Sequence, residues 1–246
     1  MRSFDSDLLG EQYHREGVVR IPRILCGQEV VALRAELERY MREDLPKMPL
    51  DARTFESDGK TVRNLWRLEK YHPALLPRLE KPEIVELVSR LVHGEPLLVG
   101  VETFNKAARV GSGVPYHQDN AYFCQTPPDM LTLWIAMDPV TIENGPVYYV
   151  RGSHKRGIQP TRPSGVRGNS IGLAEAPCVS LEDQFCGLLD PGDALIHHCE
   201  TIHHSAPNTS DSPRLGLLLV YRGAHTQTNA KLKAAYTAAV TATPPA

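Results

Sequence analysis

The spacing of hydrophobic and polar residues divides the chain into two parts. In the first part, residues 27–44 (GQEVVALRAELERYMRED) place an apolar side chain at every third or fourth position, with charges between them. This period predicts an amphipathic helix. Residues 81–95 (KPEIVELVSRLVHGE) repeat the pattern over a shorter span, with a proline suited to the first turn and a glycine suited to the end. Both segments are expected to be helices that flank the main body of the domain.

From about residue 97 the pattern changes to short apolar or alternating runs, which is typical of strands. The runs are PLLVGVETFNKAAR, LTLWIAMDPV, GPVYYVRG, CGLLDPGDALIHH and RLGLLLVYRG. Glycine, proline and asparagine turn signals separate them, so the series predicts a β-sandwich or barrel. Residues 155–185 show no clear period and are interpreted as a long irregular insertion. The tail after residue 226 is expected to be a short helix followed by a loose end.

The length and charge of the chain exclude several classes of protein. A chain of 246 residues with 41% hydrophobic residues is long enough for one large β domain. The net charge is −2, and no polybasic run is present, which argues against nucleic-acid binding and against a membrane-surface protein. No apolar stretch approaches the roughly 18 residues of a membrane span, and the charged N-terminus does not resemble a secretory signal.

The cysteines are odd in number and none forms a CxxC pair. They are Cys26, Cys124, Cys178, Cys186 and Cys199. This pattern favours reduced thiols over a disulfide framework or a zinc ribbon, and we expect a cytoplasmic protein.

Candidate metal ligands stand in the segment VPYHQDNAYF, where His117 and Asp119 flank a single glutamine. In an extended strand, residues i and i+2 project to the same face. The pair could therefore bind one metal ion together, or it could form a surface ion pair.

A second group of candidate ligands lies in residues 195–223, where four of the ten histidines of the chain are found. They are His197, His198, His203 and His204. Two histidines and one carboxylate on one face of a metal leave positions open for substrate and dioxygen, which is the arrangement of non-haem Fe(II) oxygenases.

Three segments, taken in order, resemble the phytanoyl-CoA dioxygenase family. They are HQD at 117–119, ENGPVYYVRGSHKRG at 143–157 and HHSAPNTSDSPR at 203–214. Members of this family are Fe(II)- and 2-oxoglutarate-dependent oxygenases built on a double-stranded β-helix, also called a jelly roll. The resemblance implies a mostly β, cupin-like domain over 1–246, with N-terminal helical decoration over 1–96, a jelly-roll core over about 97–225 and a tail over 226–246.

The resemblance also implies the metal ligands. His117 and Asp119 match the first two iron ligands, and alignment on the distal motif selects His203 as the third. His198 matches an additional polar residue that is common in the family. His204 stands where many relatives have glycine, and strand alternation directs it away from His203.

The resemblance further implies a cosubstrate site. Arg214, eleven residues after the distal histidine, matches the arginine that binds the far carboxylate of 2-oxoglutarate, a role for which a planar guanidinium fork is suited. Ser205 could add a hydrogen bond to the same carboxylate. Asn105 resembles a polar cosubstrate contact, and Trp134 a tryptophan near the cosubstrate, although packing in the core explains Trp134 equally well.

The implied reaction uses Fe(II), 2-oxoglutarate and dioxygen to oxidise, by default to hydroxylate, an unactivated C–H bond of a small molecule, with release of succinate and carbon dioxide. Cyclisation, desaturation and epimerisation are alternative outcomes of the same chemistry. Halogenating relatives lack the carboxylate ligand, so Asp119 argues against halogenation. A non-catalytic metal-binding jelly roll and a zinc hydrolase are rival readings. Bacterial members often tailor small molecules, including antibiotics, but substrate identity and oligomeric state stay open.

Overall fold

The computed structural model describes residues 5–241, and within them helices surround a core of antiparallel strands. The α-helices are α1 (Ser6–Glu16), α2 (Gly27–Glu43), α3 (Leu68–Tyr71), α4 (Leu76–Leu79), α5 (Pro82–Leu91), α6 (Asn120–Phe123) and α7 (Ala230–Thr241). Short 3-10 helices span Leu45–Lys47, Leu50–Ala52, Pro73–Leu75 and Ser153–Arg156. None of the helices in this part of the chain has the length and apolar character needed to cross a membrane.

Two antiparallel sheets form the centre of the domain. The larger sheet has the order β1-β12-β7-β14-β4-β3-β2, and the smaller sheet has the order β11-β8-β13-β5. The strands of the larger sheet are β1 (Val18–Ile21), β2 (Arg53–Phe55), β3 (Val62–Leu65), β4 (Pro96–Lys106), β7 (Met130–Ala136), β12 (Ala194–His198) and β14 (Arg214–Gly223). Those of the smaller sheet are β5 (Val114–His117), β8 (Val147–Val150), β11 (Gln184–Cys186) and β13 (His203–Ser205).

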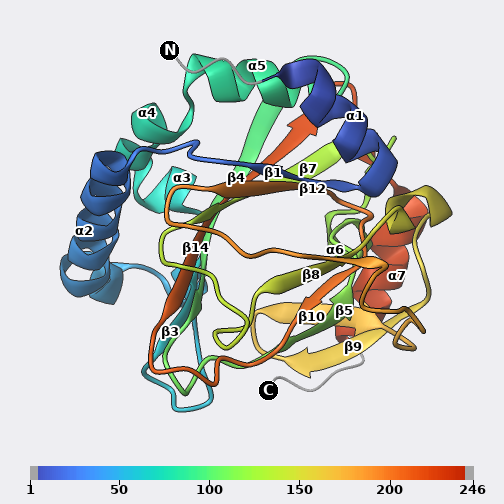
Figure 1. Cartoon of the computed structure of the whole chain (residues 1–246). Coiled ribbons are helices and arrows are strands. Elements are labelled where there is room, and N and C mark those ends of the chain that lie inside the picture. The colour runs from blue at the N-terminus through green and yellow to red at the C-terminus, as the bar shows by residue number, and fades with distance from the viewer. Residues whose placement is uncertain (1–4, 242–246) are drawn as a thin grey trace.

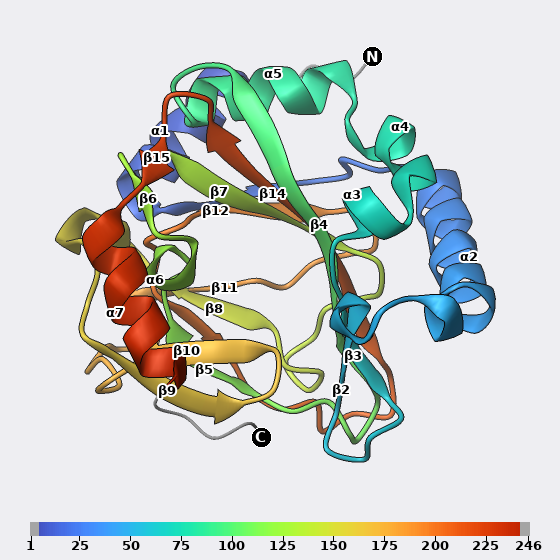
Figure 2. The same cartoon turned by 180° about the vertical axis from the view of Figure 1, so that it is seen from behind.

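Two further pairs of strands lie beside these sheets. They are the hairpin β9 (Thr161–Val166) and β10 (Asn169–Leu173), and the short pair β6 (Gln125–Thr126) and β15 (Gln227–Thr228). In Figures 1 and 2 the larger sheet faces the smaller one, and α7 lies along the β9–β10 hairpin. This arrangement is a jelly roll, as the resemblance to the phytanoyl-CoA dioxygenase family implied.

Alternation along the strands gives the larger sheet two different faces. On β14, Leu217 and Leu219 belong to the main hydrophobic core, whose other side is formed by α2, α5 and neighbouring turns. Leu218 between them belongs to a smaller cluster with Trp134 of the same sheet and Tyr149 of the opposite sheet. We call these the outer face and the inner face of the larger sheet.

The two predicted helices are present, with ends close to those expected. At the start of α2, the backbone N–H of Cys26 donates to Oε2 of Glu29 at 2.7 Å, which satisfies one of the backbone groups exposed at a helix start. In α5, Pro82 occupies the first turn, and the helix ends at Leu91. Each helix buries its apolar stripe against the outer face of the larger sheet.

The boundaries expected from the sequence differ from the observed elements in two places. The N-terminal part, expected to be helical decoration, also contributes β1, β2 and β3 to the larger sheet. The region 155–185, expected to be irregular, contains the β9–β10 hairpin. β1 pairs with β12 and β3 pairs with β4, both further along the chain, and local patterns do not report such pairing. The β9–β10 hairpin is local, but its sequence shows no clear alternation. The tail contains α7, and residues 242–246 lie outside the described part.

Candidate active site

Three potential metal ligands converge between the two sheets. His117 ends β5, Asp119 follows it at the start of α6, and His203 on β13 is the cross-strand partner of His117. Oδ1 of Asp119 lies 3.6 Å from Nε2 of His117 and 3.5 Å from Nε2 of His203. All three side chains are buried, and one ligand atom from each lies within 4.8 Å of the others. One ion with bonds of about 2.1 Å could therefore contact all three.

Two side chains of the larger sheet contact Oδ2 of Asp119, the carboxylate oxygen that does not face the two candidate histidine ligands. Oδ2 lies 3.0 Å from Nε2 of His197, and the Thr132 hydroxyl donates to it at 3.2 Å. His197 on β12 and Thr132 on β7 are cross-strand partners, so the sheet register brings both to one point. Oδ1 faces the two imidazoles and accepts a hydrogen bond from the Tyr122 hydroxyl at 2.5 Å. These contacts fix the direction in which the carboxylate would meet a metal.

Both candidate histidine ligands are oriented by backbone carbonyls. Nδ1 of His117 lies 2.9 Å from the carbonyl oxygen of Pro115, and Nδ1 of His203 lies 2.9 Å from that of Thr201. An Nδ1–H that donates to a carbonyl leaves the Nε2 lone pair free for a metal. Burial lowers the pKa of both imidazoles, that of His203 most strongly.

The carboxyl group of the site remains ionised. Burial opposes ionisation of Asp119, but its interactions with the imidazoles, His203 first, hold the pKa of the carboxyl well below its usual range. The site therefore combines two imidazoles with one carboxylate, which is a donor set suited to Fe(II). The residues present therefore fit the Fe(II) centre that the resemblance implied.

Arg214 lies at the start of β14 with its guanidinium almost completely buried. Its Nη1 donates to the carbonyl of Gly145 at 2.6 Å, and the guanidinium lies 5.0 Å from the ring centre of Trp134. Its Nε has no hydrogen-bond partner among residues 5–241. Because an unpaired buried N–H is costly, the guanidinium is suited to a carboxylate that a ligand would bring.

The close approach of Trp134 to Arg214 depends on Gly216. A Cβ atom at this position would lie 2.2 Å from the Trp134 ring. Only the absence of a side chain leaves space for the indole on the inner face.

These groups share one cavity of about 420 Å³ between the sheets. The metal triad, Arg214, Ser205 and Trp134 all line it. Most of the remaining wall is aromatic or aliphatic and includes Trp66, Phe104, Tyr122, Phe123, Tyr149 and Leu218. The β9–β10 hairpin also lines the cavity through residues that include Val166 and Asn169. The volume is in the range of sites that hold small molecules.

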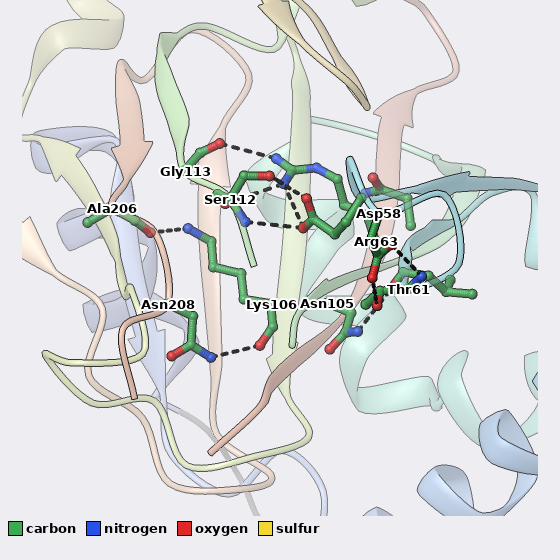
Figure 3. Close-up of polar contacts among 12 residues, drawn as sticks. Asp58, Thr61, Arg63, Asn105, Lys106, Ser112, Gly113, Ala206 and Asn208 are labelled. Atoms are coloured by element: carbon green, nitrogen blue, oxygen red, sulfur yellow. Dashed lines mark hydrogen bonds and ion pairs between the residues drawn. The ribbon is translucent and has the colours of Figure 1, made fainter. Parts of the chain in front are cut away.

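Asn105 is not brought into this cavity. On β4, Phe104 faces the cavity, so its neighbour Asn105 projects to the opposite face. The amide of Asn105 donates to the carbonyl of Val62 on β3 at 2.8 Å (Figure 3). Its contact is with the neighbouring strand, so the cosubstrate role expected from the resemblance has no support in the geometry.

A buried polar layer lies at the Arg214 end of β4 (Figure 3). Arg63 is fully buried and donates to Glu56 Oε1 at 3.0 Å and to Ser112 Oγ at 2.6 Å. Nζ of Lys106 donates to the carbonyl of Ala206. Burial, assisted by the nearby arginines, lowers the pKa of Lys106 to about 6. These bonds connect the loops around residues 112 and 206 to the strands that carry the site.

The sequence of the chain also assigns it to a known family. The profile of the family described as phytanoyl-CoA dioxygenase matches residues 13–216. The chain belongs to this family. The family and the structural neighbours are 2-oxoglutarate-dependent non-haem iron dioxygenases, so the predicted enzyme class and cofactors are confirmed.

Curated and solved relatives agree with the assignment to the phytanoyl-CoA dioxygenase family. The chain is 28% identical over 229 residues to L-proline trans-4-hydroxylase of Streptomyces griseoviridis, covering 85% of this chain and 84% of the relative. The carbocyclase SnoK of nogalamycin biosynthesis shares the fold, with a TM-score of 0.71, 24% identity and coverage of 93% and 89%. The epimerase SnoN, solved with Fe³⁺, 2-oxoglutarate and nogalamycin RO, has a TM-score of 0.70, 23% identity and coverage of 91% and 85%.

In this member of the phytanoyl-CoA dioxygenase family, the sequence motifs did not identify His197 as the partner of Asp119. The resemblance matched His198 to the additional polar residue, but His198 faces away from Asp119. The centre of its ring lies 6.0 Å from that of Tyr13 and 5.1 Å from that of His154. Alternation within β12 was the available signal, because only one of two adjacent histidines can face the inner side. His204 also lies apart from the triad, with its Nε2 3.0 Å from Oε1 of Gln184.

Glu102 was also not singled out, although it lines the cavity from β4. Burial raises the pKa of its carboxyl to about 8, assisted by the charges of Asp119 and Glu69. It lies two residues before Phe104, and their shared face was the signal that could have found it.

Proposed function

We propose that this enzyme binds Fe(II) through His117, Asp119 and His203 and hydroxylates an unactivated C–H bond of a small molecule. The observation that carries the proposal is the buried triad in one cavity with Arg214, whose Nε has no partner among the described residues. A zinc hydrolase would have no use for this arginine.

The residues of the chain would position each reactant. Nε2 of His117, Nε2 of His203 and Oδ1 of Asp119 would hold the metal, and the backbone carbonyls behind the imidazoles would keep them aligned. Arg214 and Ser205 would hold the far carboxylate of 2-oxoglutarate, with Trp134 stacked on the guanidinium. When bound, iron and 2-oxoglutarate supply the oxidising power by coupling dioxygen reduction to the release of succinate and carbon dioxide.

The walls of the cavity would determine which bond is oxidised. Their aromatic and aliphatic side chains exclude water and can hold an apolar part of the substrate near the triad. Since Asp119 fills a metal position with a carboxylate, the enzyme would oxygenate its substrate and ignore halide. Cyclisation and epimerisation stay open as outcomes, because relatives of the same fold bear the names carbocyclase and epimerase.

The proposed setting is the tailoring of a small molecule, as in antibiotic biosynthesis, in the cytoplasm and without nucleic acid. The names of the nogalamycin relatives support the first part. All five cysteines lie in the described residues and are free thiols, which supports a reducing compartment.

The test is succinate formation by the purified enzyme with Fe(II), 2-oxoglutarate and dioxygen, across a library of charged and neutral small molecules. We expect at least one compound to stimulate succinate release and to gain oxygen from labelled dioxygen. Asp119→Ala is the matched inactive control. Substrate turnover without succinate would contradict the proposal, and a halogenated product in chloride or bromide buffer would contradict the predicted outcome.

A further inference from the structure

Glu102 is an acidic group in the cavity for which the proposed reaction has no role. It lines the main cavity and also a smaller adjoining hollow of about 220 Å³, to which Phe123 and Val220 contribute as well. Within residues 5–241, no hydrogen bond or ion pair reaches its carboxylate. A carboxylate in such surroundings is costly unless a partner of opposite charge or a hydrogen-bond donor meets it.

Among residues 5–241, no lysine or arginine serves as this partner. Among the described residues, Arg214 is the one lysine or arginine that lines the main cavity. Arg214 pairs with Lys106 across the sheet, whereas Glu102 pairs with Leu218, four residues further along β14. Four residues of strand span about 13 Å, so the guanidinium lies at the other end of the cavity. Arg222 borders only the smaller hollow, where its Nη1 donates to the carbonyl of Thr226 at 3.0 Å.

The wall around Glu102 is suited to an organic cation. Trp66, Phe104, Tyr122 and Phe123 line the same cavity, and the faces of aromatic rings attract ammonium groups. An aromatic wall with one carboxylate offers a cation both cation–π contacts and an ion pair, whereas it offers an anion neither.

The charges of the loaded centre lead to the same conclusion. With Fe(II) and 2-oxoglutarate bound, the divalent metal, Asp119, the cosubstrate dianion and Arg214 sum to zero. In this low-dielectric cavity burial favours the neutral form of Glu102, as its raised pKa shows, and a cation bound beside it would favour the carboxylate. A substrate with one positive charge would then pair with the ionised Glu102, and the site as a whole would stay neutral.

We propose that Glu102 selects a cationic substrate, a small molecule whose ammonium group pairs with its carboxylate while an apolar part lies along the aromatic wall near the triad. This inference rests on the proposed function for the position of the reacting bond. The recognition of a cation rests on the cavity itself.

Binding can be measured without turnover, because Trp66 and Trp134 are the only tryptophans of the chain and both line the cavity. The enzyme, loaded anaerobically with Fe(II) and 2-oxoglutarate, would be titrated with three matched pairs of compounds while tryptophan fluorescence is followed. The pairs are choline and 3,3-dimethylbutan-1-ol, cyclohexylamine and cyclohexanol, and benzylamine and benzyl alcohol. We expect the cation to bind at least about tenfold more tightly in at least one pair, as a charge-assisted contact supports.

Three variants test the assignment to Glu102. Glu102→Gln should reduce the ratio of affinities within that pair to about one, and Glu102→Asp should retain part of it. Glu69→Gln is the control: Glu69 does not line the cavity, its carboxylate accepts a hydrogen bond from the Val101 N–H, and its removal should leave the ratio unchanged.

Two results would overturn the inference: no preference for a cation in any pair, or a preference that persists in Glu102→Gln. Absence of binding by all three cations counts as no preference. Titration of 2-oxoglutarate beforehand separates this failure from failure of the proposed function. If 2-oxoglutarate binds and the ammonium probes show no preference, only the inference about Glu102 is wrong.

Discussion

The two faces of the larger sheet are formed by the same strands but differ in composition and in packing. On the outer face, alternate residues of β7 and β14 are uniformly apolar, as in Leu133, Ile135, Leu217 and Leu219, and they pack into the main core. On the inner face, the residues between them are mixed in character and border a cavity, including Thr132, Trp134, Arg214, Leu218 and Val220.

This difference shows how one strand can supply both stability and chemistry. The outer face is close-packed against helices, so removal of a side chain would leave a void. The inner face is only partly filled, so its polar groups can remain directed toward ligands. A substitution should therefore change stability or binding according to the face on which it lies.

The largest expected effect concerns two adjacent histidines of β13 that face in different directions. His203→Ala should lower Fe(II) affinity by more than the roughly 10- to 100-fold typical of losing an outer partner of a ligand. His204→Ala should leave it unchanged, because this side chain contacts Gln184. Anaerobic calorimetric titration with Fe(II) measures both. Equal losses in the two variants would show that the third ligand is not His203.

The next effect concerns the cosubstrate. Arg214→Ala should weaken 2-oxoglutarate binding by about 2 to 5 kcal/mol, the typical result of removing one partner of a buried charge pair. Lysine should restore little, because it provides a point charge in place of a fork. Titration of the Fe(II)-loaded enzyme with 2-oxoglutarate measures the change, and Fe(II) affinity itself should be preserved. An unchanged 2-oxoglutarate titration in the alanine variant would rule out this role.

Adjacent leucines of β14 compare the two faces directly. Leu217→Ala, on the outer face, should lower the free energy of unfolding by about 2 to 5 kcal/mol, because it leaves a void in the main core. Leu218→Ala enlarges an existing cavity and should cost less stability while changing ligand binding. Urea unfolding followed by circular dichroism provides the comparison. A larger loss of stability in Leu218→Ala would reverse the assignment of faces.

The smallest expected effect concerns the group behind Asp119. His197→Ala should weaken Fe(II) binding by about 10- to 100-fold, since it removes the partner of Oδ2. The neighbouring His198→Ala should not, because His198 packs against Tyr13. The same anaerobic titration applies. An effect from His198→Ala that matched that of His197→Ala would indicate general destabilisation instead of orientation of the carboxylate.

Local sequence patterns were sufficient to predict the motifs but not the side chains that surround them. The resemblance of the HxD and distal motifs to those of the family led to His117, Asp119, His203 and Arg214, and the structure brings all four to one cavity. The resemblance also suggested Asn105, which faces the neighbouring strand. A family motif specifies positions along the chain, whereas the face of a strand changes at every residue.

The sequence by itself determined the two main helices, the change to β-structure near residue 97, the family and the metal-binding motif. The helices and the change to β-structure depend on periodicity, which the chain carries locally. The family and the metal-binding motif depend on the resemblance of short motifs to those of known proteins. Only the tertiary structure decided that β1, β2 and β3 join the larger sheet, that His197 and not His198 reaches Asp119, and that Glu102 lies unpaired in an aromatic wall. Each of these depends on the register between strands that are far apart in the chain, and register is set by the packing of the whole sheet.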